Sequence, residues 1–387
     1  MNENVIYLNN AATSFPKPES VYDAVDRTQR EFGAPGRGSG LPIDTVIRKL
    51  RRDLAEFIGG GDGSIVFTFN GTDALNTAIR GAVRPGDHVV TTATEHNSVL
   101  RPLRWLEEAY GVRVTRVPCD AVGRVAVESV LEAVSSETKL VVLNHASNVT
   151  GTIQPIEAIC EKLRRLPNGR DVLILLDAAQ SLGHVPIDVE AWQIDMLASP
   201  GHKGLLGPLG TGFLYLRPGI KDRIVPLRFG GTGTHSDEDR QPTTLPDRYE
   251  SGTLNAPGLA GLAAGLDYVQ KRGPDAIESH ERRLTARFLE GVATIAGVSV
   301  VGPTDTTDRT AVVSVVVQGY GPDEVAGLLS SHFRIAVRSG VHCAPLIHPF
   351  LGTDKAGTVR FSFGPFNDDE QIDAAVEALR QIAGHAP

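Results

Sequence analysis

The sequence predicts an α/β protein whose mostly parallel sheet is buried on both faces. Short apolar runs, each long enough for one strand, alternate with segments of helical length through the first two-thirds of the chain. These runs are SIVFTF (64–69), HVVTTA (88–93), VRVTRV (112–117), KLVVLN (139–144), DVLILL (171–176) and TGFLYL (211–216). Continuous apolar strands separated by helices are typical of a parallel sheet covered by helices on both sides.

Helices are expected between these runs and again near the end of the chain. Apolar residues recur at helical spacing from Ile43 to Ile58, which indicates an amphipathic helix. After Pro257 a helix rich in small residues leads to a long charged helix, two strands at 311–317 and 357–363, and a closing helix. We therefore expect a large domain at 16–255, and a smaller α+β domain made of 1–15 and 256–387.

Composition limits the classes of protein that the chain can belong to. Its 387 residues, 41% hydrophobic and 22% charged, are those of a soluble globular protein with a large core. The net charge of −8 argues against a nucleic-acid or anionic-membrane partner. No apolar run approaches the roughly 20 residues of a membrane helix, and no signal-peptide pattern is visible. The spacing of the three cysteines fits neither a disulfide framework nor a zinc site, so we expect a cytoplasmic protein without a metal.

Polar clusters follow the predicted strands, at the carboxyl ends where open α/β sheets bind ligands. The segment NGTD (70–73) begins a helix, so its N–H groups and hydroxyl suit an anion, although a simple helix cap has the same residues. His96 follows the second run, and its ring would stack on a planar ligand, move protons, or merely cap the next helix. Further clusters begin at His145 and Asp177.

Asp177 and Lys203 are the most specific of these residues. Asp177 directly follows an apolar run, and a carboxylate buried there needs a cationic partner such as a protonated pyridine nitrogen, unless it serves only as a helix cap. Lys203 lies between glycine-rich turns just before the run at 211–216, where a partly desolvated amine becomes a nucleophile. Together with an anion site and a stacking histidine, they predict that Lys203 holds pyridoxal phosphate as a Schiff base.

These motifs resemble those of the class V aminotransferases, a superfamily of fold-type I pyridoxal-phosphate enzymes, and within it those of the cysteine desulfurases. The likeness runs from YLNNAATSFPKP near the start to TVRFSFGPFN near the end, and SPGHKGLLGPLGTG and LLDAAQSLGH are its most specific strings. It implies the corresponding fold, in which a large cofactor-binding domain precedes a smaller C-terminal domain.

The resemblance implies a role for each matching residue around the cofactor ring. Asp177 would pair with the pyridinium nitrogen, and Gln180 would donate a hydrogen bond to the ring oxygen. His96 would stack on the ring and assist Lys203 in proton transfer. Asn148 would contact the ring hydroxyl or the substrate carboxylate.

The resemblance likewise implies which residues hold the phosphate: Gly71, Thr72, Asp73, Ser199 and His202. Many relatives have a phosphate-binding serine where this chain has Pro200, and Ser199 would take over its part. Thr253, in YESGTLNAPG, matches a position that reaches the phosphate of the other subunit, which implies a homodimer with shared active sites.

Two features of the C-terminal part indicate the reaction. Arg360 matches the family arginine that binds the substrate carboxylate, for which a guanidinium is well shaped. Cys343 lies in RSGVHCA, a string similar to the one that carries the reactive cysteine of desulfurases, whereas Cys119 and Cys160 are interpreted as structural. A thiolate is the strongest sulfur acceptor among side chains.

The resemblance thus implies conversion of L-cysteine to L-alanine, with the sulfur taken up by Cys343 as a persulfide and passed to an acceptor protein. A selenocysteine lyase, another carbon–sulfur lyase and an aminotransferase of the same superfamily stay open as alternatives. The acceptor and its pathway, whether iron–sulfur cluster assembly or thiolation of RNA or of a cofactor, are not indicated by the sequence.

Overall fold

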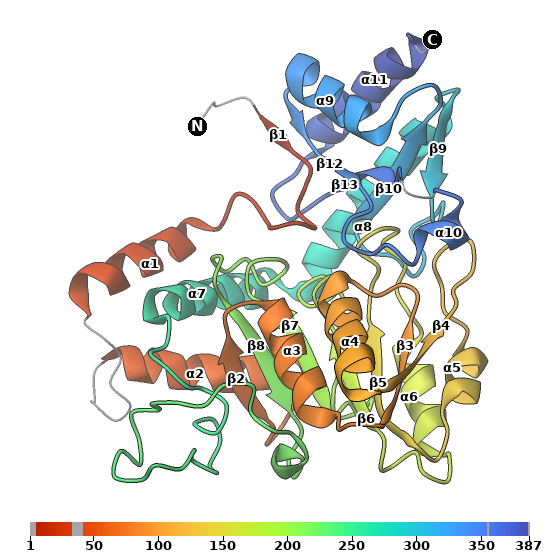
Figure 1. Cartoon of the computed structure of the whole chain (residues 1–387). Coiled ribbons are helices and arrows are strands. Elements are labelled where there is room, and N and C mark those ends of the chain that lie inside the picture. The colour runs from red at the N-terminus through yellow and green to blue at the C-terminus, as the bar shows by residue number, and fades with distance from the viewer. Residues whose placement is uncertain (1–4, 33–41, 354–355, 386–387) are drawn as a thin grey trace.

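The computed structural model describes residues 5–32, 42–353 and 356–385. A seven-stranded sheet with the order β2-β8-β7-β6-β5-β3-β4 forms the centre of the larger part (Figure 1). Its strands are β2 (Ser64–Thr68), β3 (His88–Thr92), β4 (Arg113–Val117), β5 (Thr138–Asn144), β6 (Leu173–Asp177), β7 (Met196–Pro200) and β8 (Gly212–Leu216). Only the pairs that involve β8 are antiparallel. The predicted mostly parallel sheet is confirmed.

Helices cover both faces of this sheet. They are α1 (Glu19–Glu31), α2 (Pro42–Phe57), α3 (Gly71–Ala82), α4 (Asn97–Tyr110), α5 (Val127–Ala133), α6 (Ile156–Arg164), the 3₁₀ turn η1 (Lys221–Arg223) and α7 (Ala256–Arg272). On β5, Leu140 and Val142 pack in the cluster that includes α3 and α4, whereas Val141 and Leu143 pack in the cluster that includes α2, α6 and α7. Because both faces are buried, the centre of β5 from Leu140 to Leu143 is apolar without interruption.

The C-terminal part has its own sheet and core. The antiparallel sheet has the order β12 (Arg338–Gly340), β13 (Thr358–Ser362), β10 (Val312–Val317) and β9 (Val298–Val301). Its helices are α8 (Pro274–Ala293), α9 (Pro322–Phe333), α10 (His348–Leu351) and α11 (Asp369–Gly384). Phe288 of α8, Phe361 of β13 and Leu379 of α11 share one hydrophobic cluster. This core is separate from those of the large sheet.

The N-terminal strand joins the smaller part of the molecule (Figure 1). Strand β1 (Ile6–Tyr7) pairs in parallel with β11 (Ile335–Ala336). The division at residues 255–256 stays a prediction, and core packing favours one change to it. Leu259, Leu262 and Leu266 of α7 belong to a cluster of the large sheet, so α7 packs with the large domain rather than the small one. Within the described residues, every helix is too short or too polar to cross a bilayer.

Candidate active site

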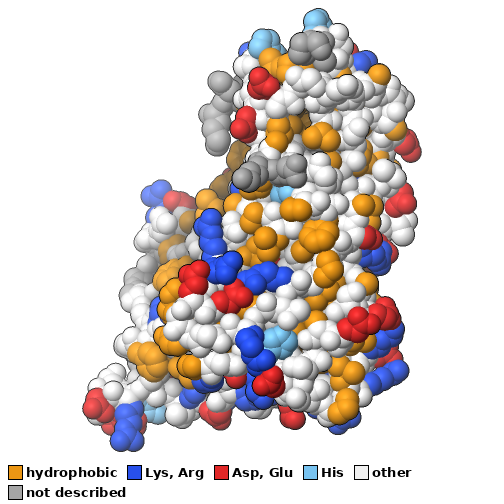
Figure 2. Space-filling model, turned by 45° about the vertical axis from the view of Figure 1, so that its right-hand side comes forward, with side chains coloured by type: hydrophobic (Ala, Val, Ile, Leu, Met, Phe, Trp, Pro, Cys, Tyr) orange, Lys and Arg blue, Asp and Glu red, His pale blue; other side chains and the backbone are white. Residues whose placement is uncertain are grey.

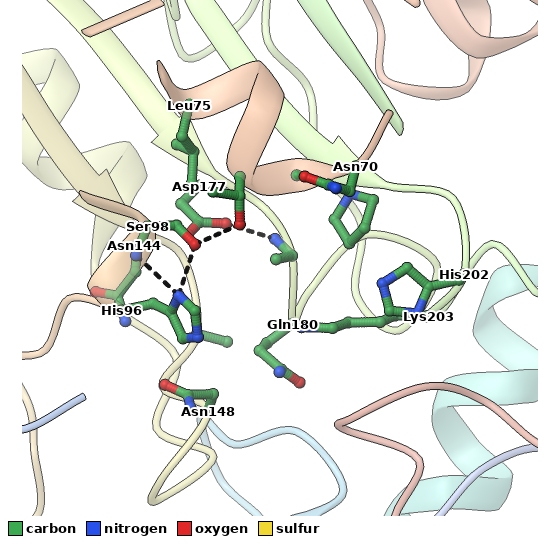
Figure 3. Close-up of a pocket in the computed structure, with 15 residues that line it drawn as sticks. Asn70, Leu75, His96, Ser98, Asn144, Asn148, Asp177, Gln180, His202 and Lys203 are labelled. Carbon is green, nitrogen blue, oxygen red and sulfur yellow. Dashed lines mark hydrogen bonds between the residues drawn. The ribbon is translucent and has the colours of Figure 1, made fainter. Parts of the chain in front are cut away.

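A cavity of about 260 Å³ opens at the carboxyl ends of the parallel strands (Figure 3). It is lined by Asn70, Gly71, Thr72, Leu75, His96, Ser98, Asn144, Ala146, Asn148, Asp177, Ala179, Gln180, Pro200, His202 and Lys203. Lys203 follows the carboxyl end of β7, and the chain then returns through the antiparallel strand β8. This reversal brings the lysine to the edge of the sheet that carries Asp177 and His96.

Burial shifts the pKa of both Asp177 and Lys203, which line this cavity. Asp177 ends β6, is 6% exposed, and its Oδ1 accepts the Ala179 N–H at 2.9 Å. Burial raises the pKa of this carboxyl, against the opposing effect of the charge on Lys203. Burial lowers the pKa of Lys203 to about 8, again with Asp177 opposing the shift. The cavity therefore contains a carboxyl, that of Asp177, which a nearby cation would stabilise in its charged form. It also contains an amine, that of Lys203, which loses its proton more easily than an ordinary lysine.

A chain of hydroxyl contacts joins the beginning of α3 to His96. The Thr72 and Ser98 hydroxyls lie 2.7 Å apart, and the Ser98 hydroxyl lies 2.8 Å from His96 Nδ1 (Figure 3). His96 Nδ1 also accepts the Ser98 backbone N–H at 3.0 Å, so the ring carries its proton on Nε2. Burial, followed by the charges of Lys203 and Arg338, lowers the pKa of His96 to about 4. The ring that faces the cavity is neutral.

The first residues of the chain hold the backbone around Lys203. The Ser14 hydroxyl donates to the Lys203 carbonyl at 2.9 Å, and Lys17 Nζ donates to the His202 carbonyl at 2.9 Å. The Gln180 side chain, expected at the cofactor oxygen, donates to the Ala11 carbonyl at 2.9 Å. The lysine loop is thus fixed by a segment that is distant in the sequence.

Three predicted cofactor residues do not line this cavity. Asp73 donates its N–H to the Asn70 side chain, which caps α3, and its carboxylate pairs with Arg228. Ser199 is 2% exposed within β7, and its hydroxyl contacts the Pro200 carbonyl at 3.3 Å. Strand geometry explains this position, because successive side chains of a strand point to opposite faces. Thr253 is exposed at the surface.

Seven lining residues were not predicted from the sequence: Asn70, Leu75, Ser98, Asn144, Ala146, Ala179 and Pro200. Asn70 is the side-chain cap of α3, and Ser98 connects Thr72 with His96. Asn144 ends β5 opposite Asp177, and Ala146 follows it. The available signal for Asn70 was its place directly after a strand and before a helix. Within the described ranges, no group of three potential metal ligands is present.

The small domain contributes Arg360 to the neighbourhood of the cavity. Arg360 of β13 is fully buried; its Nη1 donates to the Asn148 carbonyl at 2.9 Å and its Nη2 to Asn9 Oδ1 at 3.1 Å. In the described part of the chain, its Nε has no partner. Burial lowers the pKa of Arg360 to about 9, and Arg338 adds to this effect. A buried guanidinium with an unused N–H is suited to an incoming carboxylate.

Cys343 is half-buried on a strained turn next to this arginine. Its backbone φ is +60°, and that of His342 is +49°, values that favour glycine. Arg338 Nη2 lies 3.2 Å from the Cys343 sulfur. Two contacts hold the turn: the Asn97 N–H donates to the Cys343 carbonyl at 2.7 Å, and Asn148 Nδ2 donates to the His342 carbonyl at 2.6 Å.

His342 does not act as a charged neighbour of the thiol. Its Nε2 lies 2.9 Å from the Thr358 hydroxyl. Burial, followed by Arg360 and Arg338, lowers the pKa of His342 to about 2, so the ring is neutral. Asn148, which was predicted at the ring hydroxyl or the substrate carboxylate, lines the cavity; its side chain contacts the turn of Cys343 and its carbonyl contacts Arg360.

Nearly the whole chain is similar in sequence to known proteins of one family. The family model for class-V aminotransferases matches residues 6–375. A protein of Methanothermobacter thermautotrophicus named "Probable cysteine desulfurase" is 37% identical over 98% of this chain and 95% of its own. A protein of the same name from Pyrococcus abyssi is 34% identical over 99% of this chain and 95% of its own.

The fold comparison agrees with the sequence comparison. The apo structure of a cysteine desulfurase from Thermococcus onnurineus has a TM-score of 0.90 and 33% identity, covering 98% of this chain and 95% of that one. The family model and these relatives span nearly the whole chain, including the lysine loop and the cysteine turn. The chain belongs to the class-V aminotransferase family and, within it, to the cysteine desulfurases.

Proposed function

We propose that the chain converts L-cysteine to L-alanine and takes the sulfur onto Cys343 as a persulfide. One observation carries the proposal: charged groups of both domains act on Lys203. Lys203 and Asp177 come from the large sheet, and Arg360 and Cys343 come from the small domain. The pKa of Lys203 responds to the charges of Asp177, Arg360 and Cys343, so all four lie within electrostatic reach of one another.

The cofactor of this family is pyridoxal phosphate, and the residues of the cavity fit it. Gly71 and Thr72 begin the helix α3, where an anionic phosphate is stabilised. His202 lines the cavity, and its buried Nδ1 lacks a partner in the described ranges. Asp177 would hold a proton at the pyridine nitrogen, and Lys203 would bond to the aldehyde carbon. When bound, the cofactor supplies an electron-accepting ring to the α-carbon of an amino acid.

Arg360 and Lys203 would act on the two ends of the substrate backbone. Arg360 has an N–H group without a partner among the described residues, and it would bind the substrate carboxylate. This contact would place the α-hydrogen near Lys203 Nζ, which takes the proton once the amine is uncharged. His96, neutral and aligned by Ser98, would cover one face of the reacting group.

Cys343 would perform the step that distinguishes this reaction from transamination. Its thiolate attacks the sulfur of the substrate, so an S–S bond forms while the Cβ–S bond breaks. The electron pair of the broken bond stays with the carbon fragment, which gains protons and leaves as alanine. The Arg338 guanidinium, 3.2 Å from the sulfur, orients the thiol for this attack.

We also propose a homodimer and a protein that accepts the sulfur. An exposed apolar patch supports the dimer, because Phe69 is 58% exposed and Phe229 is 66% exposed. Arg228 lies over the Phe69 ring and pairs with Asp73 at the beginning of α3. A partner subunit on this patch would lie beside the predicted phosphate site. Thr253, which is exposed, would then reach the phosphate of the other subunit.

The test is to incubate the purified holoenzyme with L-cysteine and to measure alanine and sulfide. The account predicts both products without an added keto acid, and their loss in Cys343→Ala. Parallel reactions with selenocysteine and cysteine sulfinate measure substrate preference. Sulfide release by Cys343→Ala at the wild-type rate would show that the nucleophile is wrongly assigned.

A further inference from the structure

A second hollow lies outside the cofactor cavity and reaches the sulfur of Cys343. This groove has a volume of about 600 Å³ and runs between α3 and α4. It is lined by Thr72, Asn76, Arg80, His96, Asn97, Ser98, Arg101, Pro102, Trp105 and Cys343. Thr72, His96 and Ser98 also line the cofactor cavity, so the two spaces share a wall. Cys343 lines the groove but not the cavity.

The groove is basic, although the chain as a whole is acidic. The net charge of the chain is −8, yet none of the groove's lining residues is an acid. Arg80 and Arg101 are exposed, and within the described ranges neither has an ion-pair partner. Arg80 lies over the Trp105 ring at 4.5 Å, and Trp105 is 40% exposed. Figure 2 shows several Lys and Arg side chains near the middle of one face of the molecule, with Asp and Glu side chains beside some of them.

The positive field extends along the groove to the reacting thiol. The pKa of His96 is lowered first by burial and then by the charges of Lys203, Arg338 and Arg101. Arg338 also contacts the Cys343 sulfur. Clefts lined by charges of one sign attract ligands of the opposite sign and raise their local concentration. A volume of 600 Å³ lies within the roughly 300–1,000 Å³ range of small-molecule sites.

We propose that this groove binds a small thiol that carries carboxylate groups and delivers it to the persulfide of Cys343. The proposal rests on the function proposed above, and it adds a small-molecule acceptor to the acceptor protein proposed there. Arg80 and Arg101 bind the carboxylates, and Asn76 and Asn97 offer hydrogen bonds along the same path. The half-buried sulfur of Cys343 is then approached from the groove, which adjoins the cofactor cavity along Thr72, His96 and Ser98.

The transfer of sulfur from the Cys343 persulfide to the small thiol needs no oxidant. The thiolate of the bound molecule attacks the outer sulfur of the Cys343 persulfide, and a new S–S bond forms on the small molecule. The S–S bond to Cys343 breaks, and Cys343 leaves as a thiolate that can accept the next sulfur. The product is the persulfide of the small thiol, so one S–S bond replaces another.

The experiment uses holoenzyme that has been loaded with one equivalent of L-cysteine and freed of small molecules. Discharge of the persulfide is followed by mass spectrometry with mercaptosuccinate, which has two carboxylates, or with neutral 2-mercaptoethanol. In the double variant Arg80→Gln/Arg101→Gln, discharge by mercaptosuccinate should slow about 10-fold at low salt, and discharge by 2-mercaptoethanol less than about 2-fold. Succinate, which lacks a thiol, should compete with mercaptosuccinate in the wild type only.

Arg104→Gln is the matched control. Arg104 is exposed on α4 like Arg101, but it lies near Glu107 and Glu108 and does not line the groove. This variant should keep the wild-type ratio of the two discharge rates. An unchanged ratio in the double variant, or an equal slowing with both thiols, would overturn the proposal. Alanine formed during loading of the wild type is a separate readout, and its absence would instead refute the proposed desulfurase function.

Discussion

The two walls of the active site differ in how the fold builds them. The cofactor wall is the carboxyl edge of one sheet, where β5, β6 and β7 end at Asn144, Asp177 and Pro200. The second wall comes from the small domain. It consists of Arg360, which lies on a different sheet, and Cys343, which lies on a strained turn. A cofactor site can therefore follow from one sheet alone, whereas the choice of reaction depends on how two domains meet.

Hydrogen bonds of two asparagines join the walls around Cys343 and Arg360. Asn148 donates to the carbonyl before Cys343 and accepts from Arg360, and Asn97 holds the carbonyl of Cys343. Variants of the cofactor wall should therefore abolish cofactor chemistry altogether. Variants of the second wall should leave the cofactor bound and change only what happens to the substrate.

The largest effect is expected for Lys203→Ala. Loss of the amine removes both the bond to the cofactor and the proton acceptor, so alanine formation should fall about 10³-fold or more. The visible absorbance of the bound cofactor should disappear in the same variant. Lys271→Ala, an exposed lysine paired with Asp267, is the control and should match the wild type. Normal absorbance in Lys203→Ala would place the cofactor on another lysine.

Cys343→Ser should distinguish the role of the second wall from that of the cofactor wall. Cofactor absorbance should stay at the wild-type level, while sulfide release should drop about 10²-fold or more, because a hydroxyl is a far weaker sulfur acceptor than a thiolate. Cys119→Ser is the matched control, since burial raises the pKa of Cys119 to about 11 and leaves that thiol inert. A drop of equal size in both variants would mean that thiol loss acts through stability, which thermal unfolding would detect.

Arg360→Gln should weaken recognition of the substrate carboxylate. A charge-assisted pair is worth about 1.5–3 kcal/mol, so kcat/KM for L-cysteine should fall about 10- to 100-fold. Cysteamine, which lacks the carboxylate, should react with the variant and the wild type at similar rates. Arg360→Lys should recover only part of the loss, because an ammonium cannot form the paired contact. An equal loss with cysteamine would assign Arg360 to packing instead.

The smallest effect concerns the pH at which the apoprotein binds its cofactor. The amine must be uncharged to react, and the pKa of Lys203 is lowered by burial to about 8. The rate of cofactor binding should rise about 10-fold from pH 7 to 9 and then level off, whereas an ordinary lysine with a pKa near 10.4 would keep rising. Asp177→Asn removes the charge that opposes the shift, so the midpoint should move to lower pH. A rate that climbs steadily to pH 10 would contradict the burial of Lys203.

The sequence predicted the cofactor wall more completely than the second wall. The apolar runs located six strands of the large sheet, because burial on both faces leaves a continuous signal. Strand β7 was missed, since Ser199 and Pro200 end its apolar run after three residues. Its omission hid the reason why Lys203 lies at the carboxyl edge, although the lysine itself was identified.

The second wall shows what sequence patterns leave out. Arg360 and Cys343 were identified through resemblance, but their partners Asn9, Asn97 and Asn148 are brought together only by the packing of the domains. His342 directly precedes Cys343 in the sequence, yet burial makes its ring neutral and Thr358 engages it. A string of adjacent residues does not determine which side chains face each other across a turn.

The central claim is that both walls act in one turnover. The direct measurement is to mix the holoenzyme with one equivalent of L-cysteine, without any other thiol, and to quantify alanine and the mass of the Cys343 peptide. The account predicts one alanine per loaded subunit and a Cys343 peptide heavier by one sulfur atom. Alanine accompanied by free sulfide and an unmodified Cys343 peptide would contradict it.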